Sequence, residues 1–382
     1  RVHKDEWTKN GVPFFRTSDV VSYFKGTKNK KAYIPSELYN SLSNKIGRVK
    51  KDDLLITGGG SIGIPFLIKS NEPLYFKDAD LLWIQNINNL NGYFLYSFLI
   101  SESFRKYLKR ISHVGTIAHY TVIQAKNTPC YFPSLTEQQK IASFLSAVDD
   151  KLQQLAKKKD LLEEYKKGVM QKIFSQELRF KDDNGNNYPD WEEKKLGEAF
   201  ENIGGTALES HFSNEGSHSV ISIGNYGING KYNDNGQRIV LNEKTQTKLL
   251  DKNNLVMVLN DKTKTGDIIG LTILIDEDDK YIYNQRSERL ICDSSILTPL
   301  YSWTYLNSKQ FRRLVFSISQ GGTQIYVNFS AVKGLNFPIP CIKEQDKIAD
   351  FLSSLDSKID SVSNQIKNTK AFKKGLLQQM FV

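Results

Sequence analysis

The sequence predicts a mixed α/β protein built as an internal two-fold repeat, in which each of two globular blocks leads into a long helix. Three observations indicate this fold class. The string EQQKIASFL at 137–145 returns as EQDKIADFL at 344–352, which is 207 residues further along the chain. Apolar residues after each string recur with a mean step of 3.5 residues, the period of a coiled-coil seam. The segments before the strings alternate between apolar runs, glycine turns and amphipathic stretches, which indicates strands and helices in one domain.

The two blocks show the same order of elements. In the first, 53–68 (DLLITGGGSIGIPFLI) and 81–87 (LLWIQNI) predict strands around glycine turns, and 93–111 (YFLYSFLISESFRKYLKRI) predicts one helix. In the second, 255–276 (LVMVLNDKTKTGDIIGLTILID) predicts two strands joined by a polar loop. In this block, 301–318 (YSWTYLNSKQFRRLVFSI) predicts the matching helix. Segment 321–340 (GGTQIYVNFSAVKGLNFPIP) predicts strands that connect the block to the second long helix. Segment 181–190 (KDDNGNNYPD) has the composition of a loop and marks the boundary between the repeats.

Each block is followed by a long helix whose apolar residues alternate steps of four and three. Thr136 followed by Gln139 predicts a capping box at the start of the first helix. Lys159, Lys166 and Lys373 interrupt the seams, as does Thr369, and we expect the lysines to set the coil register. We expect the two seams to pack against each other within the chain, as rods of about 50–55 Å. The seam residues are Ile141, Leu145, Val148, Leu152, Leu155, Leu162, Val169 and Ile173 in the first helix and Ile348, Leu352, Leu355, Ile359, Val362, Ile366, Leu376 and Met380 in the second.

The repeat also sets the division of the chain. Phe104–Arg105 and Gly115–Thr116 recur at the same offset as Phe311–Arg312 and Gly322–Thr323. We therefore predict a first block at 1–135, a helical region at 136–180, a second block at 181–341 and a second helical region at 342–382. The second block opens with DWEEKKLGEAF from Asp190, whose counterpart would precede residue 1. We expect that about 20 or more residues of the natural N-terminus are missing.

Composition favours an anionic partner and a reducing compartment. The chain of 382 residues has a net charge of +10, and such a basic balance is typical of proteins that bind nucleic acid. The first block holds 19 Lys and Arg against 10 Asp and Glu, a net charge of +9. Residues 175–342 hold 18 against 21, a net charge of −3, so the second block can bind DNA only if its charges are segregated. Cys130, Cys292 and Cys341 have no disulfide or metal spacing, and no apolar run is long enough to span a membrane.

The sequence contains no convincing catalytic constellation. Its five histidines lack metal-ligand spacing, and the glycine-rich segment 56–63 (ITGGGSIG) lacks the Gly-Lys-Ser/Thr of a phosphate loop. NTPCY at 127–131 and PDWEEKK at 189–195 contain letters of methyltransferase and nuclease motifs without the required arrangement. We therefore expect no catalytic residue, no metal and no cofactor in this chain, and a binding role in which partners carry the chemistry.

The repeated arrangement resembles the specificity subunit of type I restriction-modification systems. The resemblance rests on the pattern P-x-P, EQ-x-KIA-x-FL and D-x-K before a long helix, and it covers essentially the whole chain. Pro133 through Asp149 and Pro338 through Asp356 look like the two conserved regions of that family. The globular heads vary within the family, so no base-reading residue carries over. This chain departs from the family pattern in the missing start of its first head and in its acidic second head.

This resemblance implies a cytoplasmic, non-catalytic DNA-binding subunit that acts in DNA methylation and host defence. Each block would be a target recognition domain that reads one half of a bipartite site in double-stranded DNA. The two helices would form an intramolecular antiparallel coiled coil that fixes the spacing between the half-sites. Two methyltransferase subunits that use S-adenosylmethionine would dock on the helices, and motor-endonuclease subunits that use ATP and Mg can then join them.

Candidate DNA contacts are polar and basic residues in the loops of both blocks. Lysines suit phosphate contacts, whereas Arg, Asn and Gln can read base edges through paired hydrogen bonds. The candidates in the first block are Lys25, Thr27, Lys28, Lys30, Lys31, Ser61, His113, Thr116, His119 and Tyr120. Those in the second block are Asn225, Tyr226, Lys231, Arg238, Lys262, Lys264, Arg286, Thr323, Gln324 and Tyr326.

Two other functions compete with this interpretation. The chain could be a stand-alone nuclease or methyltransferase with its own recognition domains, which would modify DNA without partners. It could also be a coiled-coil scaffold with no role on DNA. A salt titration of duplex binding separates the scaffold from a DNA reader, because phosphate-driven association weakens steeply with salt.

Overall fold

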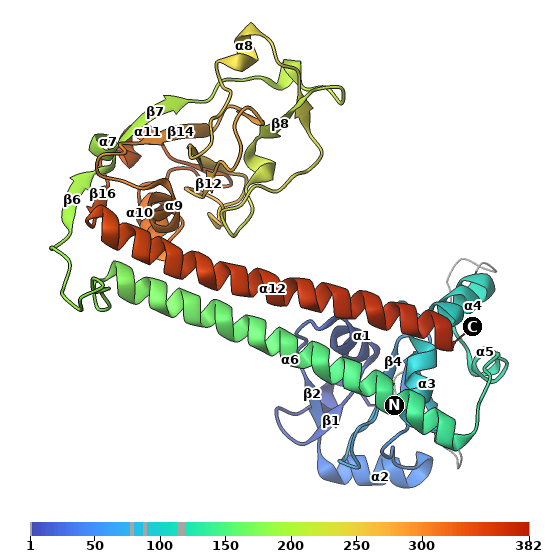
Figure 1. Ribbon diagram of the computed structural model, residues 1–382. Helices are drawn as coiled ribbons and strands as arrows, with labels where there is room; N and C mark the ends of the chain where they lie inside the picture. The colour runs from blue at the N-terminus through green and yellow to red at the C-terminus, as the bar shows by residue number, and fades with distance from the viewer. Residues whose placement is uncertain (1, 77–79, 87–89, 113–118, 382) are drawn as a thin grey trace. The chain divides into compact units, whose positions relative to one another are not determined.

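The computed structural model describes residues 2–76, 80–86, 90–112 and 119–381 (Figure 1). They form two compact units. Unit 1 is Arg1–Lys158 with Val362–Val382, and unit 2 is Lys159–Ser361. Each unit therefore contains one globular block and its own portion of both long helices, α6 (Leu135–Phe174) and α12 (Ile342–Met380).

The block of unit 1 contains a small three-stranded sheet and a two-stranded ribbon. The strand β3 (Leu54–Thr57) is fully buried and pairs antiparallel with β4 (Pro65–Leu67) and β5 (Leu81–Ile84). The strands β1 (Val12–Phe14) and β2 (Ala32–Ile34) form the ribbon. Apolar residues of β3 and β4 pack with residues of two later helices in one core cluster, and those of β1 and β2 lie in another. The helices are η1 (Lys4–Glu6), α1 (Thr17–Lys25), α2 (Ser36–Ile46), α3 (Gly92–Leu99), α4 (Glu102–Ser112) and α5 (Val122–Lys126).

The block of unit 2 is larger. Its main sheet has the order β12 (Thr272–Leu274), β10 (Leu255–Val258), β14 (Ser287–Cys292) and β7 (Phe200–Gly204), all antiparallel. A second sheet pairs β8 (His218–Ile221) with β13 (Tyr281–Tyr283) in parallel and with β9 (Arg238–Ile239) antiparallel. Two ribbons pair β11 (Asn260–Asp261) with β15 (Ile325–Tyr326) and β6 (Glu192–Lys195) with β16 (Asn336–Ile339). The helices are α7 (Leu196–Ala199), η2 (Glu209–His211), η3 (Ile223–Asn225), α8 (Glu243–Gln246), α9 (Pro299–Leu306), α10 (Lys309–Ser317) and α11 (Phe329–Val332).

Three predictions about local structure were wrong. Segments 93–111 and 301–318 each form two helices, because Ser101 and Ser308 cap a new helix by accepting hydrogen bonds from Phe104 N and Phe311 N at 3.3 and 3.1 Å. Segment 321–340 contains α11 between its two strands. The first long helix begins at Leu135, so Ser134 rather than Thr136 occupies the capping position.

In each unit, α6 and α12 pack antiparallel and are joined by an ion pair. In unit 1, Lys373 Nζ donates to Asp149 Oδ1 at 2.5 Å. In unit 2, Lys166 Nζ donates to Asp356 Oδ1 at 2.6 Å, and these two residues are the repeat equivalents of the first pair. Two of the seam-interrupting lysines thus bridge the two helices. All sixteen predicted seam residues are buried or half-buried, as a coiled-coil seam requires.

The repeated sequence motif anchors each block to a long helix in the same way. In unit 1, Gln138 Oε1 accepts from Asn91 N at 2.9 Å, and its Nε2 donates to Pro133 O at 2.9 Å. In unit 2, Gln345 Oε1 accepts from Thr298 N at 2.8 Å, and its Nε2 donates to Pro340 O at 2.8 Å. Both glutamines are buried. The Glu-Gln motif is therefore a structural joint between head and helix.

Aromatic packing repeats as well. Phe381 lies 5.2 Å from Phe94 between ring centroids in unit 1, and its counterpart Phe174 lies 6.2 Å from Tyr301 in unit 2. Figure 1 shows α3 and α4 beside the end of α12 and α9 and α10 beside its start. The two units are thus built on one plan.

Candidate nucleic-acid interface

The loop after the first buried strand is held in the same place in both units. In unit 1, Tyr120 N donates to Gly58 O at 2.7 Å. In unit 2, Val327 N donates to Leu259 O at 2.9 Å. The chain therefore brings the loop that follows β3 or β10 next to the segment that follows the Gly-Thr sequence. In unit 2 the first of these segments is longer, and it contains Asn260 of β11 and Lys262.

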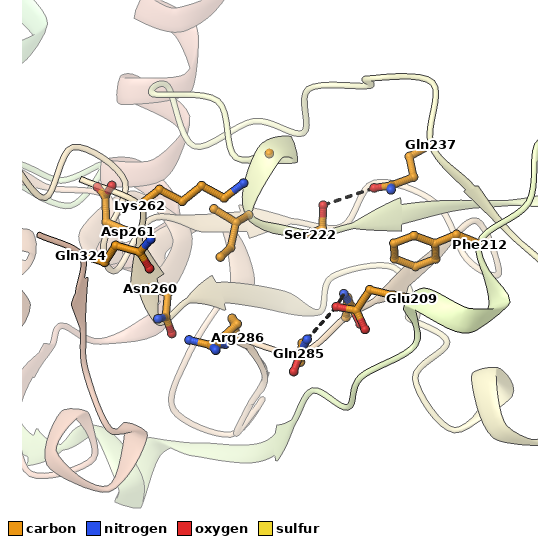
Figure 2. Close-up of a pocket in the computed structure, with 13 residues that line it drawn as sticks. Glu209, Phe212, Ser222, Gln237, Asn260, Asp261, Lys262, Gln285, Arg286 and Gln324 are labelled. Carbon is orange, nitrogen blue, oxygen red and sulfur yellow. Dashed lines mark hydrogen bonds between the residues drawn. The ribbon is translucent and has the colours of Figure 1, made fainter.

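A pocket of about 360 Å³ opens at this junction in unit 2. Figure 2 shows Lys262, Gln324, Asn260 and Arg286 on one side of it. On the other side lie Glu209, Phe212, Ser222, Gln237 and Gln285. These residues come from loops and strand ends rather than from one element. Amide and basic side chains of this kind provide the donors and acceptors that recognise base edges.

Hydrogen bonds within the protein occupy both carboxylates of the pocket. Glu209 Oε1 accepts from Asn284 Nδ2 at 2.9 Å and from Gln285 Nε2 at 2.6 Å, and the bond from Asn284 in particular lowers the pKa of Glu209. Burial acts to raise the pKa of Asp261, but hydrogen bonds from Ile268 N and from Thr263 outweigh it, so this pKa is lowered. Both carboxylates stay charged near neutral pH, and both accept hydrogen bonds from donors of the protein itself.

Three of the predicted DNA contacts of the second block line this pocket: Lys262, Arg286 and Gln324. Lys264 and Thr323 are exposed in the same two loops. Tyr326 is 43% exposed on β15, and its hydroxyl lies 3.3 Å from Gln320 Oε1. Six of the ten candidates of this block thus line the pocket or lie within two residues of its lining.

The other four candidates have partners inside the protein. Asn225 is fully buried and donates to Asn233 O at 2.9 Å, and Tyr226 donates its hydroxyl to Ser287 Oγ at 2.8 Å. These two side chains support the loop before β9.

The remaining two are basic residues in ion pairs. Lys231 pairs with Asp360 of α12 at 2.6 Å. Arg238 pairs with Asp234 at 2.9 Å, and its hydrogen bond lowers the pKa of Asp234 to about 2. Neither of them lines the pocket.

The described candidates of the first block lie in a basic segment and in the two loops that the Tyr120–Gly58 hydrogen bond joins. Thr27 and the four lysines of this segment are exposed at the end of α1 and in the loop after it. Arg16 Nη2 donates to Lys30 O at 2.6 Å and thereby fastens that loop to the start of α1. The lysines concerned are Lys25, Lys28, Lys30 and Lys31.

Three described candidates of the first block lie in the loops that meet at the junction in unit 1. Ser61 and His119 are exposed there. Tyr120 is 2% exposed with its hydroxyl 2.6 Å from Thr128 Oγ1, and burial raises its pKa to about 12. His113 and Thr116 lie outside the described residues.

Sequence reasoning missed most of the pocket residues, including Asn260, Gln237, Gln285 and Glu209. They lie in loops and in very short elements, η2 and β11, that have no periodic pattern. The signal that could have found Asn260 is its place two residues after the end of the buried strand β10, because functional residues often lie on segments held by a rigid sheet.

The described part of the chain contains no group of three or more His, Cys, Asp and Glu side chains that could hold a metal ion. The three cysteines are free thiols, and burial raises the pKa of Cys130 to about 12 and that of Cys292 to about 11. None of the helices described has the length and apolar character needed to cross a membrane.

Comparison with known proteins identifies the family. Residues 2–164 and 188–369 each match the type I restriction modification DNA specificity domain. The chain belongs to this family. One match falls on each block, so the predicted family and the predicted two-fold repeat are both confirmed.

One relative and the solved structures match over nearly the whole chain, and a second relative matches over part of it. The type I restriction enzyme MjaVIII specificity subunit of Methanocaldococcus jannaschii is 25% identical over 391 residues, which cover 95% of this chain and 90% of the relative. A putative specificity subunit of Haemophilus influenzae is 31% identical over 150 residues, which cover 38% of this chain and 35% of the relative.

The solved structures share the fold at low sequence identity. The type I restriction-modification S subunit from M. genitalium has a TM-score of 0.57 at 16% identity, covering 100% of this chain and 92% of its own. A chain from the structure of a type I restriction-modification system has a TM-score of 0.59 at 15% identity, covering 96% and 90%. The relatives are named specificity subunits, in agreement with the expected non-catalytic role.

Proposed function

We propose that this chain reads DNA sequence for a type I restriction-modification complex, with each unit recognising one half of a bipartite site in double-stranded DNA. The observation that carries the proposal is the duplication: one specificity-domain match falls on each block, and each block is joined to the long helices by the same buried glutamine. Two equivalent readers in one chain suit a site composed of two half-sites.

The distribution of charge supports DNA binding by the acidic second block. The acidic run Asp276–Asp279 lies in the turn between β12 and β13, and none of its residues lines the pocket. The pocket itself presents Lys262 and Arg286, while its two carboxylates are occupied by local donors. Segregation of this kind lets a domain of net negative charge offer a positive site to phosphate and bases.

The proposal includes the helices and the partners. Segments 1–135 and 181–341 act as target recognition domains, and segments 136–180 and 342–382 form the coil that sets the distance between half-sites. Two methyltransferase subunits with S-adenosylmethionine supply adenine methylation. Motor-endonuclease subunits with ATP and Mg join that core for cleavage in the cytoplasm. Support comes from the specificity-subunit names of the relatives and from a structural neighbour solved for complex assembly of the type I system.

The test is DNA binding by the full chain co-purified with its methyltransferase partner. We expect preference for one duplex sequence over a scrambled one, with affinity that falls steeply between about 50 and 200 mM salt. The partner alone serves as the control. Equal affinity for all sequences in the presence of the chain would contradict the proposal, and methylation by the chain without its partner would favour a stand-alone enzyme.

A further inference from the structure

Hydrogen bonds with three other segments of unit 2 hold the turn that contains Arg286. Asn284 N donates to Ile221 O at 2.9 Å, and Asn284 Oδ1 accepts from Leu208 N at 2.9 Å. Leu259 N donates to the carbonyl of Arg286 at 2.8 Å. Arg286 has a φ of 70°, in the left-handed region that disfavours a residue with a Cβ atom. Glycine would close such a turn without strain, so the turn itself does not require an arginine.

The guanidinium is oriented by a neighbouring amide. With the Asn260 amide placed so that its nitrogen donates to Leu259 O at 3.2 Å, its oxygen accepts from Arg286 Nη1 at 2.7 Å. This amide assignment satisfies the hydrogen-bonding groups of both residues. Asn260 follows the buried strand β10, so a rigid element fixes one edge of the guanidinium and leaves its other donors toward the pocket.

The charge of Arg286 is not neutralised by a carboxylate among the described residues. Arg238 and Arg289 of the same unit pair with Asp234 and Asp251 at 2.9 and 2.6 Å. The pocket carboxylate Glu209 instead receives the amides of Asn284 and Gln285. Arg286 is therefore an oriented cation with free donors in a concave site.

We propose that Arg286 reads a guanine in the half-site recognised by unit 2. This inference rests on the proposed function and assigns one base to one residue. Guanine offers two acceptors, O6 and N7, on its major-groove edge, and arginine can donate to both at once. Adenine places an amino donor where guanine has O6, so the same guanidinium would disfavour it. Asn260 acts as the positioning residue.

A phosphate group is the competing ligand for an arginine in such a pocket. A phosphate contact would weaken binding to all sequences about equally, whereas a base contact changes preference at one position. The flexible, exposed Lys262 is the better candidate for phosphate. Variants at the two positions should therefore behave differently.

The experiment selects a randomised duplex library with the full chain bound to its methyltransferase partner, at one fixed salt concentration, and sequences the bound DNA. Arg286→Ala should lose the preference for one guanine in one half-site by about 5- to 150-fold and leave the other half-site unchanged. Asn260→Ala should weaken the same preference by a smaller factor. Lys262→Ala should lower affinity evenly, and Arg313→Ala, at an exposed arginine of α10 outside the pocket lining, should change neither.

Thermal unfolding and co-purification with the partner show whether each variant folds. If Arg286→Ala does not fold, Asn260→Ala and Arg286→Gln carry the test. An unchanged sequence preference in folded Arg286 variants, an even loss at all sequences, or a half-site without guanine would each overturn the inference. A wild-type complex that selects no sequence would instead overturn the proposed function.

Discussion

Truncating Gln345 to alanine should lower the stability of unit 2, because this side chain joins the globular block to α12. The side chain is fully buried. It accepts from Thr298 N at 2.8 Å and donates to Ile296 O and Pro340 O at 2.7 and 2.8 Å. Gln345→Ala leaves one N–H and two carbonyl groups without these partners. Each buried group left unpaired costs about 1–3 kcal/mol, and the lower value for all three groups gives an expected loss of roughly 3 kcal/mol.

The assay is thermal unfolding of the full chain together with hydrogen exchange at the Thr298 amide. A loss of roughly 3 kcal/mol lowers the Tm of a unit of this size by about 6–12 °C. The Thr298 amide should exchange faster in the variant, because its acceptor has been removed. Gln365→Ala is the matched control, since Gln365 is exposed on the same helix, and it should change stability by less than about 0.5 kcal/mol.

The repeat supplies a second test of the same reasoning. Gln138→Ala removes the equivalent bonds to Asn91 N and Pro133 O and should destabilise unit 1 instead of unit 2. A Gln345→Ala protein with the stability of the Gln365→Ala control, and with unchanged exchange at Thr298, would refute the argument that the repeated motif is a joint.

Three further predictions concern charged groups. Arg179→Ala should lower the free energy of unfolding by about 3–5 kcal/mol in a denaturant titration, because Glu344 is fully buried and accepts from Arg179 Nη2 at 2.8 Å; a loss below about 1 kcal/mol would contradict this. Burial raises the pKa of Glu288, so the native state binds this proton more tightly than the unfolded chain and loses stability as pH rises above about 4.5. Glu288→Gln should therefore raise Tm at pH 8 and lose that advantage near pH 4, and an equal gain at both pH values would count against it. A double-mutant cycle on Lys166 and Asp356 should give a coupling of about 1 kcal/mol that shrinks with added salt, and zero coupling would remove this pair as a link between the helices.

The repeat could be predicted because equivalent positions in the two units have the same backbone and packing requirements. Gly63 and Gly270 have φ of 70° and 71°, and a Cβ atom there would meet Leu108 and Val315, which are repeat equivalents. Such steric requirements keep the same residue types at a fixed offset of 207, and this offset is visible in the sequence. The alternating seam is visible for the same reason, since a coil needs apolar residues at regular steps.

The helix breaks and the pocket could not be predicted in this way. Ser101 and Ser308 lie within amphipathic patterns that continue on both sides, so the periodicity conceals the cap. Lys262, Gln324 and Arg286 come from three loops far apart in sequence, and only the tertiary fold brings them to one pocket. The four lysines of the first block lie in one short segment, 25–31, so their proximity is visible in the sequence itself, and their contact with DNA stays a prediction.

The most direct test of two readers spaced by a coil is a matched deletion in both helices. Removing 151–157 and 365–371 takes seven residues from each helix between the two cross-helix ion pairs and keeps the seam in phase. Seven residues correspond to about 10 Å of helix. Sequencing of methylated adenines in cells that carry this variant and its partner subunits should give the same two half-sites separated by a shorter gap, by up to about 3 base pairs at 3.4 Å each. Methylation of the original site with its original gap would contradict the account.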